Sequence, residues 1–128
     1  MECRARRRGF ICRRPLHTVT AQFDVHRNKG ALKESIPFVV VVQSSLFDRY
    51  RRRVVAPLVR RSALPANTAT AGSRMNPVFE VEGVQVVLHP LDIVSVALDQ
   101  LGEQATSLAE QGQAVADALD ELLTRSWG

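Results

Sequence analysis

Hydrophobic residues in the first two thirds of the chain recur in short runs with the spacing of β-strands. Phe23 and Val25 alternate with polar neighbours, which is typical of a strand with one buried face. Residues 38–42 form a continuous, mostly β-branched run, which is typical of a strand covered on both faces. Another strand is expected over residues 53–59. Pro57 within it predicts an edge position or a bulge, because proline cannot donate a ladder hydrogen bond.

The following segments predict a loop, a hairpin and a further strand. Residues 62–76 are rich in Ala, Thr, Ser, Pro and Gly and have no clear period, which is typical of a loop. Residues 78–88 contain two short, valine-rich runs around Glu82-Gly83, and this pattern predicts a hairpin with a tight turn. A last strand is expected over residues 93–98.

The spacing changes to that of a helix near the carboxyl end. Val115, Leu119 and Leu123 recur four residues apart within residues 107–126, which predicts one amphipathic helix. Gly112 weakens the first turns by about 1 kcal/mol relative to alanine, so we expect a firm helix only from the next residue. The chain of 128 residues is long enough for one core. The predicted fold is therefore mainly β, with five or so strands followed by one C-terminal helix.

The net charge of +4 belongs to the amino-terminal segment rather than to the whole chain. Residues 1–20 contain six arginines and one acidic residue, so the rest of the chain is close to neutral. We therefore divide the chain into a basic leader, residues 1–20, and a folded domain, residues 21–128. The leader lacks the apolar centre of a secretory signal. It is either a basic arm for nucleic acid or, as we expect, a disordered leader or a mis-assigned start, with initiation near Val19.

Hydropathy and cysteine usage favour a cytoplasmic protein without a metal. No apolar run approaches the ~20 residues that cross a bilayer, so no membrane association is expected. Both cysteines, Cys3 and Cys12, lie in the leader at a spacing that matches no common zinc site. Nothing suggests a disulfide framework, and a reducing compartment fits best.

Candidate catalytic groups are few and scattered. The three histidines show no metal-ligand spacing, and no glycine-rich phosphate loop is present. Cleavage of RNA by general acid–base chemistry would require His26, His89, Arg52 and Arg53 to meet in space. For the arginine-rich run at residues 49–53 we favour a solvated, salt-sensitive surface loop. We therefore expect a protein that is not an enzyme and that uses no cofactor.

Trp127, the only tryptophan, is one residue from the carboxyl end. A tryptophan ring left in water exposes about 150–250 Å² of mostly apolar surface. The ring can fold back on its own core at the i, i+4 spacing from Leu119 and Leu123. It can also pack across a two-fold dimer, or it can be a hot spot for a partner, where tryptophan is enriched.

Four stretches of sequence, in a fixed order, carry a resemblance to a known family. They are Gln22-Phe23-Asp24-Val25; residues 41–58, which include Arg52-Arg53-Val54-Val55-Ala56-Pro57-Leu58; Asn76-Pro77-Val78-Phe79; and Leu101-Gly102-Glu103 leading to a helix that closes on Trp127-Gly128. Together they resemble the CcdB family, the toxin half of bacterial toxin–antitoxin operons. The likeness covers about five sixths of the chain, from residue 22 to residue 128.

The resemblance implies a small, SH3-like barrel sheet of the CcdB–PemK type with a C-terminal helix, in a homodimer. It implies a type II toxin that binds the A subunit of DNA gyrase in the bacterial cytoplasm and traps the gyrase–DNA cleavage complex. A cognate CcdA-like antitoxin with a disordered arm would neutralise this topoisomerase poison by folding on it. Repression at the operator DNA would be indirect, through the antitoxin.

The resemblance also implies which residues contact gyrase. Trp127 would stack on a cationic gyrase side chain, and Gly128 would let the backbone approach closely. Residues near the family's gyrase-facing surface are matched by Phe23, Ser44, Leu46 and Phe47. Family members commonly carry one more apolar residue after Trp-Gly, so the carboxylate here is closer to the ring. The alternatives are an endoribonuclease toxin of the same fold and an inactive relative that binds only the antitoxin.

Overall fold

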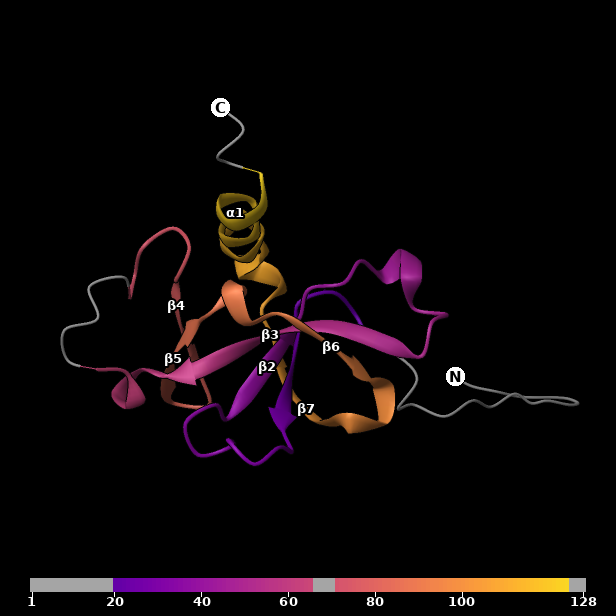
Figure 1. Cartoon of the computed structure of the whole chain (residues 1–128), viewed down its shortest axis with the longest axis horizontal. Coiled ribbons are helices and arrows are strands. Elements are labelled where there is room, and N and C mark those ends of the chain that lie inside the picture. The colour runs from indigo at the N-terminus through magenta and orange to yellow at the C-terminus, as the bar shows by residue number, and fades with distance from the viewer. Residues whose placement is uncertain (1–19, 66–70, 125–128) are drawn as a thin grey trace, which may run out of the picture.

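A computed structural model describes residues 20–65 and 71–124, which form a curled antiparallel sheet and one helix (Figure 1). The strands are β1 (Asp24–Asn28), β2 (Phe38–Val41), β3 (Arg52–Arg60), β4 (Val78–Val81), β5 (Val84–Leu88), β6 (Val94–Ala97) and β7 (Leu101–Ser107). Helix α1 (Gly112–Leu123) follows them. The predicted class, mainly β with one C-terminal helix, is confirmed. The basic leader up to residue 19, with both cysteines, lies outside the described residues.

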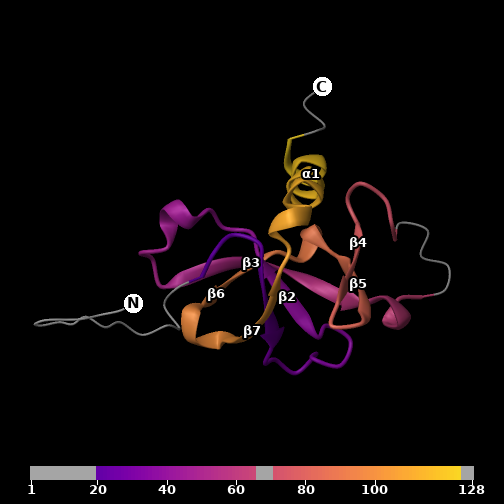
Figure 2. The same ribbon diagram turned by 180° about the vertical axis from the view of Figure 1, so that it is seen from behind.

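The strands pair in the order β4-β5-β3-β2-β1-β7, and β6 pairs with β3 beside β5. Every pairing is antiparallel. The curvature of the sheet makes a half-barrel, and α1 stands up from it in both views (Figures 1 and 2). None of the helices in the described part of the chain is long and apolar enough to span a membrane.

One continuous core lies between the curled sheet and the first turns of α1. Val115 and Ala118 bring the apolar face of the helix onto the sheet, and both are fully buried. Fully burying a valine or leucine side chain contributes about 1.5–3 kcal/mol, so this core supplies most of the stabilisation. The core residues are Val25, Phe38, Val40, Ala56, Leu58, Phe79, Val81, Val86, Leu88, Leu108, Val115 and Ala118.

The predicted hairpin is confirmed, down to its turn. Strands β4 and β5 pair from Val78↔Val87 to Val81↔Val84. Glu82 and Gly83 both have positive φ, 52° and 79°. Two positive φ angles in a two-residue loop belong to a type I′ turn, whose twist matches that of the flanking strands.

Pro57 contradicts the prediction of an edge position or a bulge, because β3 is flanked on both sides. It pairs with β2 on one side and with β6 and then β5 on the other. The N–H and C=O of one strand residue point to the same side, and the Pro57 carbonyl accepts from His89 N at 3.1 Å on the β5 side. The β6 pairing ends at Val55 and the β5 pairing begins at Leu58. The missing N–H of Pro57 therefore falls in the gap between two partner strands and removes no ladder bond.

Strand β7 is absent from the sequence prediction, which placed a helix from about residue 107. It pairs with β1, and the register shifts twice along this edge. Gly102 allows the close approach, because a Cβ there would lie 2.4 Å from the backbone oxygen of Arg27. The helix itself begins at Gly112. The prediction of a firm helix only after the glycine was thus nearly correct.

Candidate functional site

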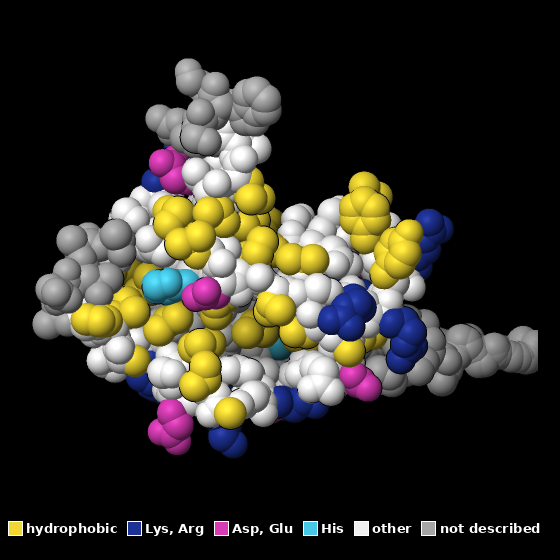
Figure 3. All heavy atoms as spheres, in the orientation of Figure 1, with side chains coloured by type: hydrophobic (Ala, Val, Ile, Leu, Met, Phe, Trp, Pro, Cys, Tyr) yellow, Lys and Arg dark blue, Asp and Glu magenta, His cyan; other side chains and the backbone are white. Residues whose placement is uncertain are grey.

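The loop between β2 and β3 projects from the sheet and exposes three large hydrophobic side chains. It contains the short 3₁₀ helix η2 (Ser45–Phe47). Leu46 is 85% exposed, Phe47 51% and Tyr50 55%, and the two rings lie 6.4 Å apart at 37°. We call Leu46, Phe47 and Tyr50 the apolar knob, and the loop between β2 and β3 that carries them the knob loop. Figure 3 shows hydrophobic side chains on this projection with basic side chains beside them. Clustered exposed apolar side chains are typical of a partner-binding surface.

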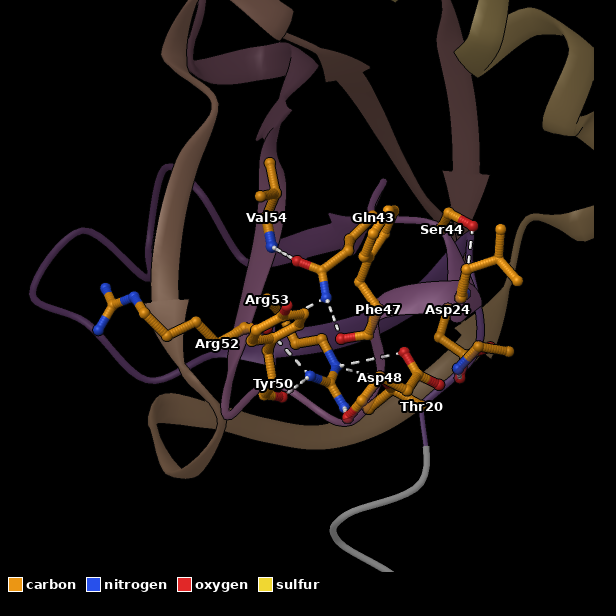
Figure 4. A network of polar contacts seen from close by, with 12 residues as sticks. Thr20, Asp24, Gln43, Ser44, Phe47, Asp48, Tyr50, Arg52, Arg53 and Val54 are labelled. Carbon is orange, nitrogen blue, oxygen red and sulfur yellow. Dashed lines mark hydrogen bonds and ion pairs between the residues drawn. The ribbon is translucent and has the colours of Figure 1, made fainter.

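Two polar side chains in the same loop set its shape. The Ser44 hydroxyl accepts a hydrogen bond from Leu46 N at 3.2 Å and so caps η2. The Gln43 amide donates to the carbonyls of Phe47 and Arg52 at 3.3 and 3.2 Å, and its oxygen accepts from Val54 N at 3.1 Å (Figure 4). Gln43 therefore ties both ends of the loop to β3. Ser44, one of the predicted gyrase contacts, has a structural task as well.

Arg53 contradicts the prediction that the arginine-rich run is solvated throughout, since its side chain is fully buried. Its Nε donates to the Thr20 hydroxyl at 2.7 Å, and its Nη1 donates to the carbonyls of Tyr50 and Arg52 at 2.6 and 2.9 Å. Its Nη2 donates to the carbonyl of Asp48 at 3.0 Å. The guanidinium therefore lies among Thr20, Asp48 and Tyr50, and its hydrogen bonds hold the knob loop to β3 (Figure 4). Thr20, which sequence assigned to the leader, is itself 5% exposed.

A hollow of about 620 Å³ lies beside the knob, between the loop and β3. Its apolar walls include Val42, Val54 and Phe47, and Arg51 and Arg52 also line it. Arg49 adds a cation over the ring of Tyr50 at 5.5 Å from its centroid. The candidate surface thus combines apolar side chains with a positively charged border, which favours an amphipathic partner segment.

Phe23 connects the amino end of β1 to the start of α1. Its φ of 74° is unusual for a bulky residue. Its N–H donates to the Val41 carbonyl at 2.6 Å, and its carbonyl accepts from Leu108 N at 2.8 Å. The ring is half-buried against Gly112 and the core. Phe23 therefore lies under the helix rather than on the knob.

The last turns of α1 are held by one basic side chain from the loop before β4. Arg74 Nε lies 3.1 Å from a Glu121 carboxylate oxygen, and its Nη2 lies 3.7 and 3.6 Å from Asp117 and Asp120. We call these four residues the helix clasp. The clasp neutralises part of a negative helix face and links the last turns of α1 to the loop before β4. Beyond Thr124 lie Trp127 and Gly128, which are outside the described residues.

A second hollow, of about 500 Å³, is lined by residues that include Leu32, Val39 and Leu101. Arg27 borders it and binds Glu82 at 2.6 Å and Glu103 at 3.3 Å. The hydrogen bond to Glu82 is the main reason that the pKa of Arg27 is raised above its usual value. Arg27 is therefore a paired cation that joins β1 to the hairpin turn and to β7.

Three of the four groups suggested for RNA cleavage, His26, Arg52 and Arg53, hydrogen-bond to separate partners. Buried His26 places Nδ1 2.9 Å from the Gly102 carbonyl, so that nitrogen carries the proton, and its buried Nε2 has no hydrogen-bond partner among the described residues. The Nε2 of His89 is buried in the same way. Arg52 donates to Ser95 and Arg53 to Thr20. None of the hydrogen bonds among the described residues joins either histidine to Arg52 or Arg53, so these contacts do not favour that chemistry.

The sequence identified part of the candidate site and missed its support. Ser44, Leu46 and Phe47 come together in one exposed loop, as expected of a shared surface. Phe23 is at the base of α1. Sequence reasoning did not single out Tyr50, which completes the knob. It named Arg53 only as a candidate for RNA cleavage and did not predict that this side chain is buried. The available signal for Arg53 was its position two residues before buried Val55, on the same face of the strand.

Comparison with known proteins gives the family. No match was found among curated proteins. The family model described as CcdB protein matches residues 22–125, a span that contains every described strand and α1. The knob loop, the Phe23 contact and the helix all fall within the matched region. The chain belongs to the CcdB family, the toxins of toxin–antitoxin pairs.

Proposed function

We propose that the protein is a gyrase poison that binds the A subunit of DNA gyrase and stabilises the complex of gyrase with cleaved DNA. The observation that carries this proposal is the family match over residues 22–125. A poison of this kind needs no catalytic group of its own. It shifts an equilibrium among gyrase states, and it does so only as far as it binds the cleaved state more tightly than the others.

The binding surface in this proposal has two parts. One is the apolar knob, where Leu46 and Phe47 can be buried by a partner at no cost to the core. The other is the carboxyl-terminal pair Trp127-Gly128, with the Trp127 ring stacked on a cationic gyrase side chain, a contact of up to ~2 kcal/mol when desolvated. Figures 1 and 2 support a joint surface, because α1 and the knob loop rise from the same side of the sheet.

Two of the remaining proposed residues, Ser44 and Phe23, support that surface, and Gly128 belongs to it. Ser44 fixes the turn that presents Leu46. Phe23 supports the start of α1 and thereby the direction in which the tail leaves the domain. Gly128 permits close approach of the partner backbone.

In the cell, the proposed active form is a homodimer in the bacterial cytoplasm with both tails near the two-fold axis. A two-fold arrangement offers the same surface twice and suits a two-fold target such as the gyrase A dimer. A cognate antitoxin of the CcdA type would cover the toxin and fold on binding. Operator DNA would be repressed through the antitoxin, not by direct contact of the toxin.

The proposal is tested with the purified full chain, reconstituted gyrase and supercoiled plasmid. We expect inhibition of supercoiling and an accumulation of cleaved DNA, both reversed by the antitoxin. A Leu46→Asp variant should lose both effects, while Lys33→Ala, an exposed change remote from the knob, should keep them. If the wild-type chain leaves gyrase unaffected and instead degrades purified mRNA, the endoribonuclease alternative replaces this proposal.

A further inference from the structure

We propose that Arg53 is a positioning residue for gyrase binding: from a fully buried site it holds the apolar knob in the shape that the partner meets. This inference rests on the proposed function. The structural observation is the set of hydrogen bonds that join Arg53 to the knob loop on one side and to Thr20 on the other. Arg53 itself touches no exposed surface, so its effect on binding would be indirect.

The burial of this guanidinium is tolerable only because its N–H groups are used. Four hydrogen bonds to described residues engage its three nitrogens, at 2.6 to 3.0 Å. The Asp48 carboxylate, 3.8 Å from Nε, adds an opposite charge at longer range. A buried cation without such partners would be strongly destabilising. The pattern of acceptors around Arg53 is therefore a built site for one guanidinium.

Two of those acceptors are the carbonyls of Asp48 and Tyr50, which lie directly after Phe47 and within the knob. The knob side chains are exposed and make little contact with the core, so packing does little to fix their direction. Gln43 ties the ends of the loop, whereas Arg53 holds its middle. A loop that is already in its bound shape loses less conformational entropy on association, and this improves affinity without a new contact.

The geometry requires arginine in particular. The planar guanidinium presents donors in a fixed fork, and here the fork reaches Thr20, Asp48 and Tyr50 from one point. A lysine ammonium has one nitrogen and cannot reach three separated acceptors together. Lysine at this position would keep the charge and leave loop carbonyls without donors. Arg53→Lys therefore separates charge from geometry.

The experiment uses the full chain with the only tyrosine, Tyr50, replaced biosynthetically by fluorotyrosine. Its fluorine NMR signal reports the knob loop alone and needs no gyrase. The variants are Arg53→Lys, Thr20→Val and Asp48→Asn. Arg60→Lys and Thr106→Val are the matched controls; Arg60 also donates to a backbone carbonyl, at the far end of β3, and Thr106 is exposed on β7. The second measurement is affinity for the isolated gyrase A fragment.

We expect Arg53→Lys and Thr20→Val to broaden or split the Tyr50 signal and to weaken gyrase binding about tenfold or more, while both controls match the wild type. If Arg53→Lys does not fold, Thr20→Val and Asp48→Asn decide the question, since the first removes one acceptor, the second removes the opposite charge, and both leave the guanidinium. An unchanged Tyr50 signal in these variants overturns the inference, as does a disordered loop with unchanged affinity. If the wild type itself does not bind gyrase, the proposed function has failed, and the Tyr50 signal still decides whether Arg53 orders the knob.

Discussion

The ring of Phe23 occupies the space that any side chain on Gly112 would need. A Cβ built on Gly112 would lie 2.6 Å from Cε2 of Phe23 and 2.9 Å from Cδ2. The first residue of α1 is thus fitted to an aromatic residue that precedes β1, and the positive φ of Phe23 directs the ring there. This contact sets where the helix begins and how closely it approaches the sheet.

Gly112→Ala should destabilise the protein, although alanine is the better helix former. Overpacking a filled site costs about 1–3 kcal/mol, and the gain in helix propensity at the first helical residue is smaller than the ~1 kcal/mol of a helix interior. We expect a net loss of about 1–2 kcal/mol in the free energy of unfolding, measured by urea denaturation. Gln113→Ala, one residue further and exposed, should stay within about 0.5 kcal/mol of the wild type.

A double variant checks the cause. Adding Phe23→Leu to Gly112→Ala should cost less than the sum of the two single changes, because the smaller side chain opens the space. Additive losses would show that the two residues do not compete for the same volume.

Leu46→Asp should weaken gyrase binding without lowering stability. Leu46 is 85% exposed and contributes little to the core. A central apolar anchor of an interface is worth about 2 kcal/mol or more, which corresponds to roughly 30-fold in affinity. Calorimetric titration with the gyrase A fragment measures the loss, and thermal melting checks the fold. Leu32→Asp, an exposed leucine in another loop, is the control and should bind normally.

Trp127→Ala should abolish growth arrest while the protein stays folded, because within the described part of the chain α1 is anchored to the core by Val115, Ala118 and Leu119. Trp127→Phe should retain part of the effect, since phenylalanine offers a weaker face to a cation. Induced expression in a sensitive strain measures growth, and the melting temperature of the purified variants measures stability. A melting temperature that falls along with toxicity would instead favour a core role for the ring.

Arg74→Gln should loosen the end of α1 in a salt-dependent way. The helix clasp is partly exposed, so we expect a loss of about 0.2–1 kcal/mol at low ionic strength. The difference from wild type should shrink in high salt, where screening weakens these pairs in both proteins. Denaturation at two salt concentrations measures it, and Arg61→Gln, whose side chain bonds a neutral glutamine, is the control. A difference that does not change with salt would mean that Arg74 acts through packing.

The parts of the fold that were predictable have strong local signals. Valine-rich runs correctly predicted β2, β4 and β5, and Glu82-Gly83 predicted the turn. Strand propensity and positive φ are properties of a few adjacent residues, so a short stretch of sequence is enough to indicate them. Strand β7 has no such signal. Its sequence from Leu101 to Ser107 is short of β-branched and aromatic side chains, and its pairing with β1 becomes favourable only once β1 is in place.

The candidate site also has some residues that the sequence could identify and others that it could not. Leu46 and Phe47 were found through resemblance, and their exposure agrees with a surface role. The burial of Arg53 depends on acceptors from three segments, of which Thr20 is 33 residues away in sequence. A window of a few residues does not contain the Thr20 acceptor. Four of the five residues from 49 to 53 are arginines, a composition typical of a solvated segment. Only the alternation of inward and outward positions along the strand indicates that Arg53 points inward.

Because Thr20 accepts a hydrogen bond from buried Arg53, the start of the folded unit differs from the start of the family likeness. Family likeness begins at residue 22, whereas Thr20, the first described residue, is buried, and Ala21 N donates to the Asp24 carboxylate. A shortened chain that started where the likeness starts would keep every recognisable motif and would discard an acceptor of a buried cation. The folded part of this toxin is therefore slightly longer than the part that resembles its relatives. A shortened variant should keep Thr20 and not start at residue 22.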